Sequence, residues 1–196
     1  MSRPMVPVSI FVAGLFGAGL VFAETYPHAF PRSGTRKLFS NERVDIWDVV
    51  WKIGVAQPLH RHRYDMAGVY LQYGQIRVTR PDGTVNPSSG RFEIPRLLFQ
   101  PKDVTHKEEG IGQPGDPERM AIMTDLKGYS PAYPPPSPGT SPAFPRQGAK
   151  KEIDNDRVTF WDYTWQPNTL VPLHFHDKDA VEVFVEGGTM VSKRRT

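Results

Sequence analysis

One motif occurs twice in this chain, first as Pro58-Leu59-His60-Arg61-His62-Arg63-Tyr64-Asp65 and again, 114 residues later, as Pro172-Leu173-His174-Phe175-His176-Asp177-Lys178-Asp179. The match extends without a gap over residues 29–79 and 143–193, and 19 of these 51 positions are identical. A repeat of this length predicts a duplicated structural unit. Because each copy keeps a His-x-His pair, we expect the chemistry of the protein at these histidines.

The residues around the first motif predict β-strands. Segments rich in Val, Ile and aromatic residues favour strands, and they cover residues 43–52, 69–73, 75–80, 91–99 and 119–126. Turns are expected at 81–83 and 86–90, where Gly, Pro, Asp and Asn gather. No sustained helical period occurs between residues 25 and 126. The pattern therefore predicts an all-β sandwich or barrel.

The spacing within the His pair is suited to a metal site on such a strand. His60 and His62 are two residues apart, so on a strand both side chains point to one face. Neutral imidazole is a good ligand for Zn, Fe, Ni and Cu. The alternative for an isolated pair is a surface or hydrogen-bonded core pair without metal, and the surrounding motifs bear on this choice.

The spacing around this pair resembles that of a known family. Gly54, His60, His62, Ala67 and Gly74 follow the spacing of the first cupin motif, in which a Gly, two His, a Glu and a second Gly recur. Residues 99–106 resemble the second cupin motif, Pro-x-Gly-x-x-His, with Asp103 in place of the usual Gly. The chain is thus similar to a bicupin with an incomplete second unit. The resemblance implies a jelly-roll β-barrel over about residues 44–126 and a partial second one over 158–193.

The same resemblance implies the metal ligands. They are His60, His62 and His106, which would bind a divalent Zn, Fe, Mn, Ni or Cu ion, with a weaker second site at His174 and His176. The family's Glu is absent, because its positions, counted back from Gly74 and Gly188, fall on Ala67 and Val181. Glu182 lies one residue beyond its position, and a shift of one residue turns a strand side chain to the opposite face. Asp65 and Asp179 recur after the His pairs as alternative ligands, but their context favours solvated turn aspartates.

Residues beside the His pair indicate the kind of ligand. By the alternation of a strand, Val69, Leu71 and Tyr73 are expected to line the barrel, which suggests a small, partly hydrophobic ligand. The alternative is that they fill the core of a barrel without a cavity. Trp47, Trp51, Trp161 and Trp165 recur in both copies and are expected to be core or interface residues.

The N-terminus has the composition of an export signal. Arg3 precedes an apolar run that ends in Val21-Phe22-Ala23, which predicts a helical signal peptide over residues 1–23 that is cleaved after Ala23. An uncleaved anchor or a buried helix is the alternative. The chain has no Cys, and an exported protein without disulfides is typical of a bacterial periplasm.

The remaining chain divides into three parts. We expect a first cupin domain at residues 24–127, a Pro-rich linker at 128–142 with six prolines, and a partial second cupin domain at 143–196. With 24 Lys and Arg against 21 Asp and Glu, scattered except at the C-terminus, no nucleic-acid surface is expected. Half a barrel leaves strand edges and apolar faces uncovered, which favours a homo-oligomer.

Three functional classes fit these features. The first is a periplasmic metal-dependent enzyme acting on a small molecule, with oxygenase, isomerase and hydrolase chemistry as candidates. The second is a non-catalytic module that binds or senses a small molecule or a metal. The third, which follows if no metal binds, is a structural oligomer that uses the barrel only as a scaffold. The missing Glu favours the second class and the three histidines favour the first, so enzyme activity stays open at this point.

Overall fold

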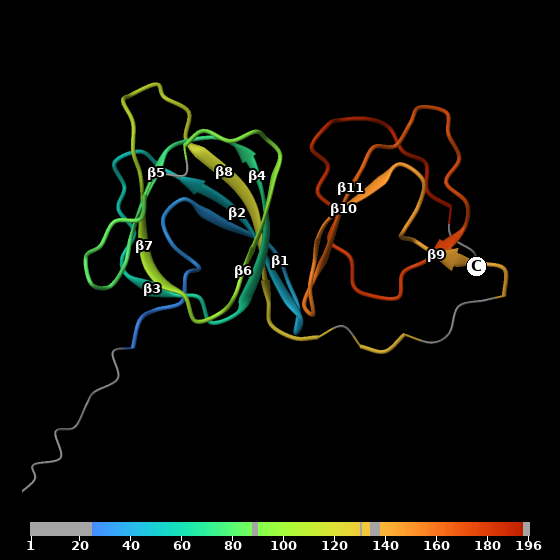
Figure 1. Cartoon of the computed structure of the whole chain (residues 1–196), viewed down its shortest axis with the longest axis horizontal. Coiled ribbons are helices and arrows are strands. Elements are labelled where there is room, and N and C mark those ends of the chain that lie inside the picture. Colours follow the sequence, from blue (N-terminus) through green and yellow to red (C-terminus); the bar gives the residue numbers. More distant parts are fainter. Residues whose placement is uncertain (1–24, 88–89, 130, 134–137, 194–196) are drawn as a thin grey trace, which may run out of the picture.

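The computed structural model describes residues 25–87, 90–129, 131–133 and 138–193. The regular secondary structure of these residues consists of β-strands. The all-β prediction is therefore confirmed for this part of the chain. Figure 1 shows a larger lobe, with β1 to β8, and a smaller lobe that carries β9 to β12. The expected signal peptide at 1–23 lies outside the described residues. Within them, no helix is long and apolar enough to cross a membrane.

Two antiparallel sheets face each other in the larger lobe (Figure 1). The first has five strands in the order β1 (Thr35–Ser40), β2 (Val44–Trp51), β8 (Arg119–Leu126), β4 (Asp65–Gln72) and β6 (Arg96–Gln100). The second has three strands in the order β3 (His60–Arg61), β7 (Thr105–Gly110) and β5 (Ile76–Thr79). Two facing sheets with such crossovers are the architecture of a jelly roll.

Most expected strands are present, with different limits. β2 and β8 lie within the predicted ranges 43–52 and 119–126. β6 begins only at Arg96, although a strand was predicted from residue 91. Pro95 directly precedes it, and proline has no N–H to donate to a strand ladder, so the strand starts after it.

The core of the larger lobe lies on one face of β2, β8 and β4. Trp47 and Val49 on β2 are buried against Met123 on β8. Gly68 of β4 is paired with Met123, and a Cβ at this glycine would lie 2.2 Å from the Met123 sulfur. The inward residues of β4 before its register shift are therefore Met66, Gly68 and Tyr70.

This alternation corrects the predicted lining of the barrel. Val69 and Leu71 were expected to point inward beside the histidines. Val69 lies on the opposite face of β4 from Met66 and Gly68, and Leu71 falls where the register between β4 and β8 shifts. Tyr73 lies beyond the end of β4 and packs edge-on against Phe92. The inference of a hydrophobic ligand from these three residues is therefore not supported.

The smaller lobe repeats local contacts of the larger one at the same offset of 114 residues. Its strands are β9 (Ser141–Pro142), β10 (Ala149–Asp154), β11 (Thr159–Tyr163) and β12 (His174–Phe175). Ala149 pairs with Tyr163 as Thr35 pairs with Val49, and both hairpins have a register shift two residues after the start. Phe144 stacks on Trp161 at 5.2 Å, as Phe30 stacks on Trp47 at 5.2 Å.

The smaller lobe is much less enclosed. Among the strands that the structure describes, β11 pairs with β10 alone, whereas β2 lies between β1 and β8. Leu170 is 89% exposed and Val191 is 82% exposed. Trp165 is also exposed, while Trp47 and Trp51 are buried. Trp47 and Trp51 are thus core residues, as expected, whereas Trp165 is not in the core, and its alternative role as an interface residue stays a prediction.

Candidate metal centre

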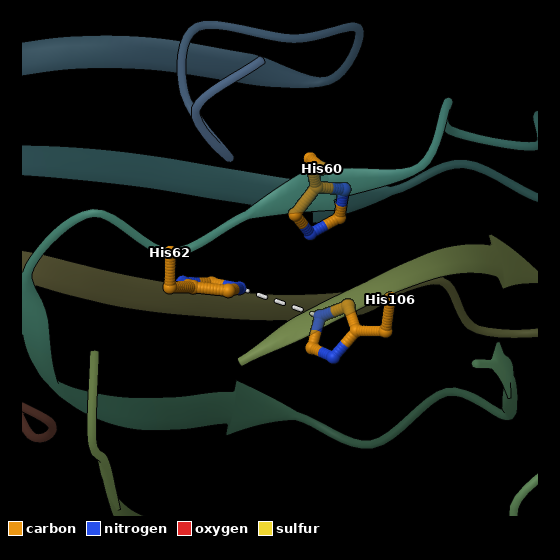
Figure 2. Close-up of side chains that lie close together, drawn as sticks. All are labelled: His60, His62 and His106. Atoms are coloured by element: carbon orange, nitrogen blue, oxygen red, sulfur yellow. Dashed lines mark hydrogen bonds between the residues drawn. The ribbon is translucent and has the colours of Figure 1, made fainter. Parts of the chain in front are cut away.

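Two neighbouring strands of the three-stranded sheet bring the first histidines together. His60 on β3 is the register partner of His106 on β7, which lies 46 residues further along the chain. His62 follows β3, and its side chain is buried like that of His60, while Arg61 between them is exposed. Figure 2 shows the three imidazoles converging on a common space between the strands. The alternation predicted from the His-x-His spacing is therefore confirmed.

The three rings form a nearly equilateral triangle. Their centroids are 5.2 Å apart for His60 and His62, 4.8 Å for His60 and His106, and 5.1 Å for His62 and His106. One nitrogen from each ring lies within 4.8 Å of the other two. The Nε2 atoms of His62 and His106 are 3.3 Å apart (Figure 2).

These distances fit a bound cation. Two imidazole nitrogens at about 2.0–2.1 Å from a tetrahedral zinc ion lie about 3.4 Å from each other, which is close to the separation of His62 and His106. The cluster is thus compatible with a divalent metal, and the three rings would supply three of its ligands. Among the residues that the structure describes, it is the only group of three or more His, Asp, Glu or Cys side chains with this geometry.

Hydrogen bonding leaves one lone pair of His60 available for such an ion. Its Nδ1 lies 3.0 Å from the carbonyl oxygen of Pro58. A carbonyl only accepts, so Nδ1 carries the proton and Nε2 carries the lone pair. This Nε2 is buried without a hydrogen-bond partner. A buried nitrogen without a partner is costly in free energy, and a metal ion would offset that cost.

Burial also keeps two of the rings in the form that metals bind. Desolvation lowers the pKa of His60 to about 4 and, joined by repulsion from the neighbouring imidazoles, lowers the pKa of His62 to about 3. Both rings are therefore neutral at pH 7. Metal ions coordinate neutral imidazole, so no proton has to be displaced from them at this pH.

A buried carboxylate next to the cluster was not among the predicted site residues. Glu108 lies two residues after His106 on β7, and its Oε1 is 3.5 Å from the His106 Nε2. Its Oε2 accepts a hydrogen bond of 2.8 Å from the Trp51 indole and forms an ion pair with Arg32. The His106-x-Glu108 spacing was a usable signal, because residues two apart on a strand share a face.

Glu108 is ionised in this environment. Burial alone raises the pKa of a carboxyl, but the charges of Arg32 and His106 and a hydrogen bond from His106 outweigh it and hold the pKa of Glu108 well below its usual range. Arg32 is itself buried, with its guanidinium over the rings of Phe30 and Trp51. The cluster therefore has a buried ion pair of Glu108 and Arg32 at its edge.

The other carboxylates considered as ligands do not join the cluster. Asp65 accepts a hydrogen bond of 2.8 Å from Arg157, and Asp179 accepts one of 2.5 Å from Arg43. Both pairs link the larger lobe to the smaller one. Ala67, which takes the position of the family's Glu, lies on the outer face of β4. Its neighbour Met66 points inward.

The second predicted site is incomplete in the structure. The His174 and His176 rings are 5.3 Å apart, and His174 Nδ1 lies 2.9 Å from the Pro172 carbonyl, as in the first pair. His176 is exposed, and no described residue completes a group of three with them. Glu182 lines an open hollow of about 460 Å³ beside His176 and Asp179.

A second buried polar network holds the N-terminal segment over the core. Asp125 on β8 is fully buried, and its Oδ2 accepts hydrogen bonds from the Trp47 indole at 3.0 Å and from His28 Nε2 at 3.1 Å. The ring of Phe30 lies edge-on to both His28 and His62. This network therefore connects the segment before β1 to the wall of the His cluster.

Comparison with known proteins finds likeness at the level of structure only. No family model and no curated protein match the chain. The chain is similar to a cupin domain from Bordetella pertussis Tohama I, with 22% identity and a TM-score of 0.40 over 54% of this chain and 100% of that one. It is also similar to an RmlC-like cupin from Methanocaldococcus jannaschii, with 17% identity and a TM-score of 0.36 over 54% of this chain and 91% of that one.

A third similar structure is a cupin superfamily protein from Desulfitobacterium hafniense DCB-2, with 18% identity and a TM-score of 0.34 over 47% of this chain and 74% of that one. The strand order and register described above establish the fold of this chain.

Proposed function

We propose that this protein is an exported cupin-like protein that binds one divalent metal ion through His60, His62 and His106. The observation that carries this proposal is the convergence of three buried imidazoles whose donor nitrogens lie within 4.8 Å of one another. His60 and His62 are neutral at pH 7, and the unpartnered Nε2 of His60 is suited to coordinating a metal ion.

The chain's own residues would prepare the site for a small molecule. The Pro58 carbonyl orients His60, and packing inside the sheet holds the rings so that little rearrangement accompanies binding. A bound divalent ion with three protein ligands supplies Lewis acidity and, for iron or copper, redox chemistry at its open positions. An oxygenase, isomerase or hydrolase acting on a small molecule is the enzymatic form of the proposal.

A non-catalytic binding or sensing module is the second candidate. It is favoured by the depth of the cluster, since His60 is 1% exposed and His62 is 3% exposed. It is also favoured by the absence of the family's Glu, whose position in β4 is taken by Ala67.

The remaining parts of the proposal concern the context of this site. We propose export to a bacterial periplasm, from the composition of residues 1–23 and the absence of Cys. We further propose that the smaller lobe is a partial second cupin unit, supported by its shared register and stacking contacts. Its exposed apolar residues support association with a second copy.

The direct experiment is the metal content of protein purified without a His tag, measured by mass spectrometry. We expect about one equivalent of Zn, Fe, Mn, Ni or Cu, and its loss in a His60→Ala/His106→Ala variant. The matched control is His174→Ala/His176→Ala, which removes the same motif from the smaller lobe and should leave the metal in place. Protein that stays folded and takes up no metal after soaking would exclude the proposed function.

A further inference from the structure

Three arginines gather around two aromatic rings at the end of the larger lobe where β4 ends and β8 begins. The guanidinium carbon of Arg119 lies 5.0 Å from the centre of the Phe92 ring and 5.7 Å from that of Tyr73. The guanidinium carbon of Arg96 lies 4.6 Å from Phe92, and that of Arg91 lies 6.0 Å from Tyr73. The two rings pack edge-on at 5.1 Å. Three positive charges therefore lie close together.

Arg119 is largely removed from water. It is 6% exposed, and its Nε donates a hydrogen bond of 2.8 Å to the Gly74 carbonyl. A third ring, that of Tyr70, lies 5.2 Å from its guanidinium carbon. The faces of aromatic rings attract a guanidinium. They carry no net charge, however, so the positive charge of Arg119 stays uncompensated.

None of the three arginines has an ion-pair partner among the residues that the structure describes. By contrast, Arg32, whose side chain is 7% exposed, is paired with Glu108. A buried charge without a partner of opposite sign is costly in free energy, and neighbouring like charges repel each other. A bound anion would offset both costs.

A hollow beside the two rings has room for such an anion. Its volume is about 840 Å³, and its walls include Tyr73, Phe92 and the exposed Arg91. Arg91 brings a cation to the wall, and the two rings bring flat apolar surface backed by the buried Arg119. Glu93 also lines the hollow. The positive side of the hollow is therefore the side of the rings and the arginines.

We propose that this hollow binds a small organic anion with a flat apolar body, such as an aromatic carboxylate. The carboxylate pairs with Arg91, and the body of the ligand packs on Tyr73 and Phe92. Arg96 and Arg119 add to the positive potential, which attracts the anion. This site goes beyond the proposed metal binding and does not depend on it.

The test uses the full chain with a chelator present, so that no metal takes part. Benzoate is the probe, benzamide has the same ring without the charge, and acetate has the charge without the ring. Isothermal titration calorimetry at low ionic strength measures the three affinities. We expect benzoate to bind at least tenfold more tightly than benzamide or acetate, and its binding to weaken as NaCl is added, because salt screens the arginines.

Arg91→Gln is the main variant, because Arg91 is exposed and its substitution leaves the core unchanged. It removes the cation of the wall and should weaken benzoate binding by about tenfold. The matched control is Arg63→Gln. Arg63 is also exposed, but it does not line the hollow, so benzoate binding should not change. Circular dichroism shows whether both variants stay folded.

Two results would overturn the inference. One is benzoate binding that equals benzamide binding or is undiminished in Arg91→Gln, which would make the hollow an apolar surface only. The other is folded protein that does not bind benzoate at millimolar concentration. Protein that binds benzoate through Arg91 but takes up no metal would support this inference and exclude the proposed function, and metal uptake without benzoate binding would do the reverse.

Discussion

Arg157 of the smaller lobe donates a hydrogen bond of 2.8 Å to Asp65 of the larger lobe. The residues 114 positions away repeat this pair in the opposite direction, since Arg43 of the larger lobe donates to Asp179 of the smaller one at 2.5 Å. Reciprocal pairs of this kind are what a two-fold interface between like units produces. The contact between the lobes therefore has the symmetry of a dimer interface within one chain.

The Arg157–Asp65 pair is expected to stabilise the contact between the lobes. Its side chains are 10% and 18% exposed, and Arg157 also donates to the Leu126 carbonyl at 3.0 Å. Removing either partner leaves a mostly buried charge unpaired, so Arg157→Ala and Asp65→Ala should each lower the free energy of unfolding by about 1–3 kcal/mol. Urea denaturation measures this, and the double variant should lose less than the sum.

The more exposed pair is the control for this experiment. Arg43→Ala breaks the equivalent contact with Asp179, where the side chains are 29% and 30% exposed. Water screens this pair more strongly, so its effect should be the smaller of the two. Additive losses at Arg157 and Asp65 would show that these residues do not act as a pair.

Stability of the metal-free protein should fall as the pH drops below neutrality. The folded-state pKa values of His60, about 4, and His62, about 3, lie below the ordinary value of 6.5 because burial disfavours the charged ring. Between about pH 6.5 and pH 4 the unfolded chain therefore binds protons that the folded chain does not, and the free energy of unfolding decreases. The loss should be on the order of 3 kcal/mol for His60.

Urea denaturation at several pH values, with a chelator present, measures this dependence. His60→Asn should reduce the slope between pH 6.5 and 4, and His174→Ala should leave it unchanged. The lowered pKa of Glu108 acts with the same sign below about pH 4.5, so it adds to the loss only at the acidic end. A flat profile from pH 7 to 4 would mean that the two rings are not buried in the neutral form.

Metal should stabilise the folded protein, because the three rings converge only in the folded chain. For free Zn²⁺ at about 1,000 times Kd, the gain is about 4 kcal/mol. We expect Tm to rise on addition of Zn²⁺ and to return after chelation, as followed by circular dichroism. His106→Ala should abolish the rise, and an undiminished rise in this variant would place the binding elsewhere.

Asp125 is expected to be essential for packing of the N-terminal segment. Asp125→Ala removes the carboxylate that accepts hydrogen bonds from the Trp47 indole and from His28. Both N–H groups then lose this acceptor. A loss of about 2–4 kcal/mol in the free energy of unfolding follows, together with a change in the near-ultraviolet dichroism of Trp47. Asp48→Ala, which removes an exposed pair with Arg36, should change stability by less than about 0.5 kcal/mol.

The histidines illustrate what can be predicted from local sequence. The side-chain alternation of an extended chain places His60 and His62 on one face, whatever the rest of the fold. Placing His106 beside them needed the family resemblance, because the pairing of β3 with β7 joins residues 46 apart. The limits of a strand were predicted well where Val, Ile and Trp are dense, as in β2. The predicted start of β6 was wrong, because Pro95 cannot donate to the strand ladder and the strand begins only at Arg96.

The inward face of β4 shows where sequence reasoning reached its limit. Alternation predicts that Met66, Gly68 and Tyr70 share a face, but it does not say which face looks inward. The residues between His62 and Asp65 are not in a strand, so the phase counted from the histidines is lost before β4 begins. Pairing with Met123 on β8 sets that phase.

Taken alone, the sequence determined the all-β class, the repeat at 114 residues and the shared face of His60 and His62, because each depends on neighbours in the chain. Only the tertiary structure decided that Glu108 faces the cluster with Oε2 held by Arg32 and Trp51, and that Arg157 meets Asp65. Such contacts join residues far apart in sequence, and no local periodicity specifies them. Strand pairing and packing bring them together.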